Sequence, residues 1–222
     1  MSDVRTNGAV FFDVDGVLID SVGVKGEAFA DVFEEYPEHR DDIIALHAGN
    51  AGIPRGRKFE MIHERILGVA LTPGRAEELR VRFATDIVPR IVAAPEIAGA
   101  GATLRNMKGR HPLHAISAVP RDELEQILEE RESLPYFRSV HGMPPSKSET
   151  VTRLLDIHGY IPRECVFVGD GTQDFIAAQD NGVPFIHVVG ASADPIADAS
   201  AVVVDLRGLN SVIERVLRDA RE

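Results

Sequence analysis

Five short apolar segments, separated by turn signals and helical patterns, constrain the fold of this chain more than any other feature. Each has the length of a buried β-strand, and an apolar run of this kind is typical of a parallel sheet. In sequence order the segments are Ala9–Val14, His114–Ser117, Cys165–Val168, Phe185–Val189 and Ala201–Val204. Because strands that alternate with helices pack into one covered sheet, we expect an α/β fold with a Rossmann-like, doubly wound parallel sheet.

Helix boundary signals lie between these segments. Pro120 is placed to open one helix, since proline is favoured at the start of a helix. Ser146 and Glu149 have the spacing of a capping box, and Gly159 is placed to end the helix that begins there. These signals support the alternation of strand and helix in the second half of the chain.

The segment from Ser21 to Ala94 interrupts this alternation directly after the first strand. It contains four helical patterns and no convincing strand pattern, and Thr72 followed by Pro73 marks the start of the fourth helix. We therefore expect a core domain of residues 1–20 and 95–222 and an inserted all-α cap of residues 21–94. The insertion has ten basic and twelve acidic residues, so it is the less acidic part of a chain whose net charge is −11.

The composition excludes several classes of protein. Of the 222 residues 44% are hydrophobic and 27% charged, which is a globular balance. The net charge of −11 and the absence of Trp disfavour nucleic-acid binding, which needs a basic face and stacking side chains. No apolar stretch is long enough to span a membrane, and the polar start lacks the apolar run of a signal peptide. The single cysteine, Cys165, fits a reducing compartment, so we expect a cytoplasmic protein that binds neither nucleic acid nor membrane.

The strongest local signal is Asp13-Val14-Asp15-Gly16 at the end of the first expected strand. Carboxylates two residues apart project to the same side of an extended strand and can diverge in a turn, and a glycine there permits close approach of the backbone. The pattern also occurs in solvated turns and in calcium loops. A calcium loop needs further acidic ligands and a closing Glu at fixed spacing, which the following residues do not supply.

A second acidic group, Asp170 with Asp174, follows the strand at Cys165–Val168. Open α/β sheets bind their ligands at the carboxyl ends of the strands, so these carboxylates are expected near Asp13 and Asp15. Clustered carboxylates repel one another unless a cation lies among them, and oxygen ligands suit a hard ion such as Mg²⁺. A purely structural role, with Asp170 and Asp174 at the start of a helix, is compatible with the same fold but leaves the clustering unexplained.

Two further polar residues occupy comparable positions. Ser117 ends the second expected strand, where its hydroxyl could bind a phosphate oxygen. Lys147 lies just before a helix; beside an acidic cluster it would balance charge and hold a phosphate oxygen. A lone lysine is more often a solvated surface group.

With these signals in this order, the chain resembles the haloacid dehalogenase superfamily. The similarity is to its small phosphatases with a helical cap of the C1 type, which include phosphoglycolate phosphatases and β-phosphoglucomutase-like proteins. The stretch Asp13–Ser21 resembles the first motif of the family, Ser117 the second and Lys147 the third, while Gly169-Asp170 with Asp174 resembles the fourth. The resemblance covers nearly the whole chain, because the cap also falls where the family places it.

The resemblance implies a Mg²⁺-dependent phosphatase that acts through an aspartyl-phosphate intermediate. Asp13 would be the nucleophile, and Asp15 would protonate the leaving oxygen and then deprotonate the attacking water. Mg²⁺ would be held by Asp13, by the backbone carbonyl of Asp15 and by Asp170. The expected partner is a small phosphorylated metabolite, for example a sugar phosphate. The expected assembly is a monomer or small homo-oligomer.

The family also assigns roles to residues around this centre. Ser117 and Lys147 would bind the phosphoryl oxygens, and Asp174 would support the metal's water ligands or Lys147. In the cap, Arg55 is expected to reach the substrate, and Lys25 lies where relatives place residues over the leaving group. For both cap residues a solvated position on a helix is the alternative.

Three other functions compete with the phosphatase. A β-phosphoglucomutase-like mutase is disfavoured because relatives of that type tend to have a histidine where Lys25 stands. A dehalogenase is disfavoured because Asp15 is present, whereas dehalogenases of the superfamily lack the second acid of the first motif. A non-catalytic binding protein on the same fold remains an alternative, although Asp13, Asp15, Lys147 and Asp170 form an intact set.

Overall fold

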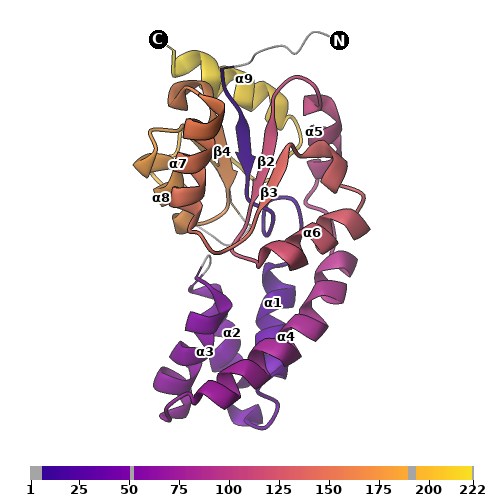
Figure 1. Ribbon diagram of the computed structural model, residues 1–222, viewed down its shortest axis with the longest axis vertical. Coiled ribbons are helices and arrows are strands. Elements are labelled where there is room, and N and C mark those ends of the chain that lie inside the picture. Colours follow the sequence, from indigo (N-terminus) through magenta and orange to yellow (C-terminus); the bar gives the residue numbers. More distant parts are fainter. Residues whose placement is uncertain (1–6, 51–52, 190–193, 222) are drawn as a thin grey trace.

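A computed structural model describes residues 7–50, 53–189 and 194–221. The polar start of the chain, on which the expectation of no signal peptide depends, falls largely in residues 1–6, outside the described residues. One parallel sheet of six strands in the order β3-β2-β1-β4-β5-β6 organises the fold (Figure 1). The strands are β1 (Val10–Phe12), β2 (Leu113–Ile116), β3 (Ser139–His141), β4 (Val166–Gly169), β5 (Phe185–Val188) and β6 (Ala201–Val203). The expected doubly wound parallel sheet is confirmed.

The first strand lies at the centre of this sheet, between β2 and β4. Val10 is opposite Leu113 on one side and Val166 on the other, and all three side chains are buried. Both neighbours are parallel, so the carboxyl ends of β1 and β4 lie side by side. The strand order reverses its direction around β1, which is the position where α/β sheets of this kind open a crevice for ligands.

Helices cover both faces of the sheet. Successive strand residues point to opposite faces, so Phe11 packs with α7 (Lys147–His158) and α8 (Thr172–Asp180), while Phe12 belongs to the core cluster on the other face. That second face is covered by α5 (Ala100–Met107), α6 (Arg121–Glu130) and α9 (Leu209–Asp219). Short 3₁₀ turns, η3 (Leu134–Tyr136) and η4 (Pro162–Glu164), complete the connections.

The helix signals in the sequence fall where the structure needs them. Pro120 is the N-cap of α6, and the capping box of Ser146 and Glu149 starts α7 at Lys147. Gly159 ends α7 in the left-handed conformation, with φ of 64°. The start of α7 therefore places Lys147 in the first helical turn, pointing toward the carboxyl end of the sheet.

A helical block follows β1 and lies beyond the carboxyl ends of the strands (Figure 1). Its elements are α1 (Val22–Asp31), η1 (Pro37–His39), α2 (Arg40–Ala48), α3 (Arg55–Ile62), a π-helical turn η2 (His63–Leu67) and α4 (Pro73–Ala93). Four phenylalanines from α1, the turn after it, α3 and α4 form its centre, with ring centroids 4.5 to 6.2 Å apart: Phe29, Phe33, Phe59 and Phe83. The block thus has an apolar core of its own.

Two chain crossings join the helical block to the sheet. Where the chain leaves and returns, the amide of Asp20 donates to the carbonyl of Pro95 at 2.9 Å. Arg131, at the end of α6, donates from one nitrogen to three carbonyls at the end of α4, those of Ile91, Val92 and Ala94.

In the described part of the chain, no helix combines the length and the apolar character that a membrane span requires.

Candidate active site

Asp13 and Asp15 lie in the loop that leaves the central strand. Asp13 is buried, with 5% of its surface exposed, and Asp15 is partly buried. The turn after them depends on Gly16, which has a φ of +76°. A Cβ atom at Gly16 would lie 2.0 Å from a carboxylate oxygen of Asp170, so only glycine lets the two loops approach this closely.

Asp170 and Asp174 follow β4 and complete an acidic cluster with Asp13. One carboxylate oxygen from each of the three lies within 4.8 Å of the other two. Close packing of Asp174 against the backbone explains Gly169, where a Cβ atom would come within 2.3 Å of the Asp174 side chain. Asp174 also accepts a hydrogen bond from the amide of Gly171, which fixes its carboxylate at the start of α8. The structure therefore brings together the acids that the sequence placed at two separate strand ends.

The electrostatics of this cluster favour a bound cation. Burial raises the pKa of Asp13 well above its ordinary value, Lys147 partly offsets this, and the neighbouring carboxylates add to it. Burial and then Asp174 raise the pKa of Asp170 to about 7. Together with Asp174, these two carboxylates form a crowded set of hard oxygen ligands that suits a divalent cation. The residues present thus fit a divalent metal centre of the kind that the resemblance implies.

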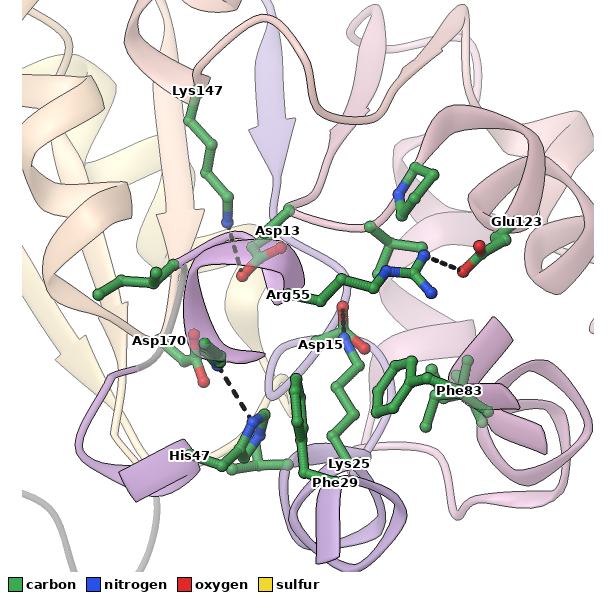
Figure 2. A pocket seen from close by; sticks show the side chains of 18 residues that line it. Asp13, Asp15, Lys25, Phe29, His47, Arg55, Phe83, Glu123, Lys147 and Asp170 are labelled. Atoms are coloured by element: carbon green, nitrogen blue, oxygen red, sulfur yellow. Dashed lines mark hydrogen bonds and ion pairs between the residues drawn. The ribbon is translucent and has the colours of Figure 1, made fainter. Parts of the chain in front are cut away.

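Lys147 connects two members of the cluster. Its Nζ lies 2.9 Å from Oδ2 of Asp13 (Figure 2). It also lies 2.6 Å from Oδ1 of Asp174. Burial alone would lower the pKa of Lys147, but Asp13 and Asp174 outweigh it and raise the pKa above its ordinary value. Lys147 is therefore a permanent cation that contacts both Asp13 and Asp174.

Asp15 has a different set of partners. Its carboxylate accepts hydrogen bonds from the hydroxyls of Ser21 at 2.6 Å and Ser117 at 3.1 Å, and Nζ of Lys25 lies 2.5 Å away. Burial acts to raise the pKa of Asp15, but Lys25 and the two hydroxyls outweigh it and lower the pKa. Ser117 and Lys25 thus lie beside Asp15, and both contact its carboxylate.

Arg55 reaches the same cavity from the start of α3. Its Nη2 lies 2.5 Å from Oε2 of Glu123 on α6, and its guanidinium lies 5.3 Å from the ring centroid of Phe83 (Figure 2). The side chains of Arg55 and Glu123 are 14% and 19% exposed. This ion pair crosses from the helical block to the sheet domain, so Arg55 is not a solvated residue at a helix start.

Lys58 is a cavity residue that the sequence analysis did not single out. It is 4% exposed, its Nζ lies 3.1 Å from Nδ1 of His47, and it lies over the ring of Phe29. Its neighbour Arg57 points to solvent and pairs with Glu60. The helical spacing could have found Lys58, because it is three residues after Arg55 and shares its face of the helix.

A cavity of about 90 Å³ lies between the sheet domain and the helical block. Acidic side chains of the sheet domain face basic side chains of the block across it, with apolar rings and aliphatic chains between them. The charged residues of its lining are Asp13, Asp15, Asp170, Glu123, Lys147, Lys25, Arg55 and Lys58. The arrangement can bind a small anion against Asp13, Asp15 and Lys147 while enclosing the rest of the molecule.

The fold and the site together define a doubly wound α/β protein that carries an aspartate pair after its first strand. A sequence model of the haloacid dehalogenase-like hydrolases matches residues 10–188 of the chain. The protein belongs to this family. A comparison with curated protein sequences gave no significant match.

Solved structures of the same family share the fold over almost the whole chain. A predicted phosphoglycolate phosphatase from Haemophilus somnus is 16% identical with a TM-score of 0.76, and covers 94% of this chain and 99% of its own. A proposed β-phosphoglucomutase from Thermotoga maritima is 23% identical with a TM-score of 0.70, covering 93% and 99%. A haloacid dehalogenase-like hydrolase from Streptococcus pneumoniae is 18% identical with a TM-score of 0.71, covering 92% and 97%. At these identities the likeness shows the fold alone.

Proposed function

We propose that this protein is a Mg²⁺-dependent phosphatase that hydrolyses a small phosphate monoester through an aspartyl-phosphate intermediate. The observation that carries the proposal is the position of Asp13. Its carboxylate contacts Lys147, and one of its oxygens lies within 4.8 Å of carboxylate oxygens of Asp170 and Asp174. A nucleophilic carboxylate needs cations around it before it can approach a phosphate. Lys147 is one such cation, and the cluster of carboxylates suits a divalent metal ion as a second. The helical block of residues 21–94 serves as the cap in this proposal, and residues 1–20 and 95–222 form the core.

The first step would transfer the phosphoryl group to Asp13. A carboxylate oxygen of Asp13 attacks phosphorus, the bond to the leaving oxygen breaks, and Asp15 supplies a proton to that oxygen. In the free protein Lys25 and the hydroxyls lower the pKa of Asp15. The acid role therefore requires that the arriving phosphate raise this pKa, which a negative charge beside a carboxylate does.

The second step would release phosphate. Asp15, now a carboxylate, takes a proton from a water molecule as that water attacks phosphorus, and the bond to Asp13 breaks. The low pKa that Lys25 imposes on Asp15 suits this base role. Asp13, Asp170 and the Asp15 carbonyl would hold Mg²⁺, whose chemistry is to neutralise phosphoryl charge. Lys147 supplies a second positive charge from the protein itself, and Ser117 keeps Asp15 oriented.

The proposal extends to partners and location. The partner is a small phosphorylated metabolite, and the protein acts as a monomer or small homo-oligomer without nucleic acid or membrane. A cytoplasmic location is supported by Cys165, which is buried and is the only cysteine of the chain. Burial raises the pKa of this thiol to about 11, so it is an inert structural group.

A screen of phosphorylated metabolites tests the proposal. The purified protein is incubated with each compound and Mg²⁺, and released phosphate is measured with and without excess chelator. Release that stops in chelator is expected. A product that keeps its phosphate on another hydroxyl would indicate the mutase alternative, and no turnover with any ester, including p-nitrophenyl phosphate, would contradict both enzymes and favour a binding protein.

A further inference from the structure

We propose that the leaving group of the substrate carries a second anionic group, a carboxylate or a phosphate, which binds to Lys58. The inference rests on the proposed function, because it adds a second charge to the phosphate monoester. It makes Lys58 the residue that determines which esters are accepted. The arguments come from the pairing of charges around the cavity, from the chemistry of His47 and from a second donor on the same helix.

Among the described residues, the cations that line the cavity are paired with carboxylates, with one exception. Lys147 contacts Asp13 and Asp174, and Lys25 contacts Asp15. Arg55 is paired with Glu123. In residues 7–50, 53–189 and 194–221, no carboxylate forms an ion pair with Lys58, whose hydrogen-bond partner is Nδ1 of His47.

A buried ammonium group without a carboxylate is costly. Removing a charge from water is repaid only when an opposite charge or several hydrogen bonds compensate it. Lys58 is 4% exposed and makes one hydrogen bond, to an imidazole, together with a contact to the ring of Phe29. The position is therefore electrostatically incomplete, and an anion entering the cavity would complete it.

His47 cannot supply the missing negative charge. Burial, followed by the charges of Lys58 and Lys25, lowers the pKa of His47 to about 3, so the ring is neutral and Nδ1 accepts from Lys58. The same burial, with Lys25 nearby, lowers the pKa of Lys58 to about 8. At neutral pH Lys58 is still mostly protonated, and His47 holds its ammonium group in place without neutralising it.

Arg55 provides a second buried donor among the residues that line the cavity. Its Nη2 is used by Glu123, but Nη1 is buried and, among the described residues, has no hydrogen-bond partner. Arg55 and Lys58 are three residues apart on α3 and both line the cavity. The buried Nη1 of Arg55 is therefore a second donor that an anion in the cavity can use.

The remaining walls favour a short leaving group without many hydroxyls. Phe29, Phe83, Ile87 and Ile91 line the cavity and offer no hydrogen-bond partners. A polyol would leave hydroxyls unpaired against them, whereas a short carbon chain would not. The inferred substrate class is therefore a small phosphorylated acid or a short bisphosphate.

Binding of uncleavable phosphonates tests this inference without depending on turnover. With Mg²⁺ present, calorimetry would compare phosphonopropionate with propylphosphonate, which differ in the terminal carboxylate, and phosphonoacetate with ethylphosphonate. Propylene bisphosphonate distinguishes a second phosphate from a carboxylate. We expect wild-type protein to bind at least one compound with a second anionic group about tenfold or more tightly than the matching alkylphosphonate. A difference of this size is the scale of a hydrogen bond to a charged group.

The variants assign that preference to Lys58. Lys58→Met should abolish it while leaving the affinity for propylphosphonate within about twofold, and Lys58→Arg should retain most of it. Arg57→Met removes the same charge from the exposed neighbour and should change nothing. If the methionine variant fails to fold by circular dichroism, Lys58→Gln replaces it.

The outcomes separate this inference from the proposed function. Equal affinity of wild-type protein for phosphonates with and without the second anionic group overturns the inference. A preference for the second anionic group that survives in Lys58→Met overturns it as well. Hydrolysis of p-nitrophenyl phosphate in the same preparations reports the phosphatase independently. Hydrolysis without any binding preference would support the phosphatase and contradict the anion site. A binding preference without hydrolysis would support the anion site and contradict the phosphatase.

Discussion

The ion pair between Arg55 and Glu123 should control how firmly the cap closes over the core. The two side chains come from α3 and α6, and they meet at 2.5 Å at the edge of the cavity. A contact that exists only when the domains are together shifts the equilibrium toward the closed form. Glu123→Gln keeps the size of the side chain and removes its charge, so it weakens this contact with little change in packing.

The size of the effect follows from the geometry of the pair. A hydrogen bond to a charged group contributes about 1.5 to 3 kcal/mol, and exposed ion pairs contribute less than about 1 kcal/mol. With side chains 14% and 19% exposed, this pair lies nearer the first case. We expect a loss of about 1 to 2 kcal/mol, which corresponds to about a 5- to 30-fold fall in kcat/KM.

The assay is steady-state hydrolysis of p-nitrophenyl phosphate, whose leaving group has no second anion to contact Arg55. Arg55→Met should cause a similar loss, and the double variant should be no worse than the poorer single variant, because the two residues act as one contact. Glu60→Gln, which breaks the exposed pair with Arg57 on the same helix, should change kcat/KM by less than about twofold. Additive losses in the double variant, or no loss in Glu123→Gln, would refute the role of the pair in closure.

Three further predictions concern the acid, the anion site and the cap core. Asp15→Asn should slow hydrolysis of esters with poor leaving groups more than that of p-nitrophenyl phosphate, because p-nitrophenolate leaves without needing a proton. Equal losses on both kinds of ester would argue against Asp15 as the acid. The kcat/KM for a substrate with an anionic leaving group should fall as pH rises through about 8, because Lys58, lowered to that pKa by burial and by Lys25, loses its charge. His47 stays neutral throughout, so the same limb should be absent in Lys58→Met, and its presence there would assign it to another group. Phe59→Ala should lower the free energy of unfolding by about 3 to 5 kcal/mol in urea titrations, since Phe59 is 1% exposed, whereas Val69→Ala, at an exposed position, should cost less than about 0.5 kcal/mol; similar costs would mean that the aromatic cluster is loosely packed.

The sheet and its helices were predictable because their signals are local. Apolar runs marked five of the six strands to within two residues at either end. The strand that the sequence did not reveal, Ser139–His141, has three residues and lies at the edge of the sheet. Its polar ends resemble a loop, and pairing with β2, which the sequence cannot show, makes it a strand.

The site was predictable in its members and less so in its contacts. The acids at two strand ends had to converge, since parallel strands share one carboxyl edge. The contacts of Lys25 and Ser117 with Asp15 depend on how α1 leaves the sheet, which no spacing rule specifies. Lys58 was missed because a run of basic residues does not show which member faces inward; that is decided by the helical phase relative to Phe59.

Trapping of the phosphorylated protein tests the central claim most directly. Wild-type protein and excess p-nitrophenyl phosphate are mixed with Mg²⁺, quenched in acid within the first turnovers, digested and analysed by mass spectrometry. We expect one phosphoryl group on the peptide that contains Asp13, more of it in Asp15→Asn, whose second step lacks its base, and none in Asp13→Asn, which should also lose far more than tenfold in kcat. Phosphate release with no phosphorylated peptide, together with Asp13→Asn turnover within about tenfold of wild type, would contradict the nucleophilic role of Asp13.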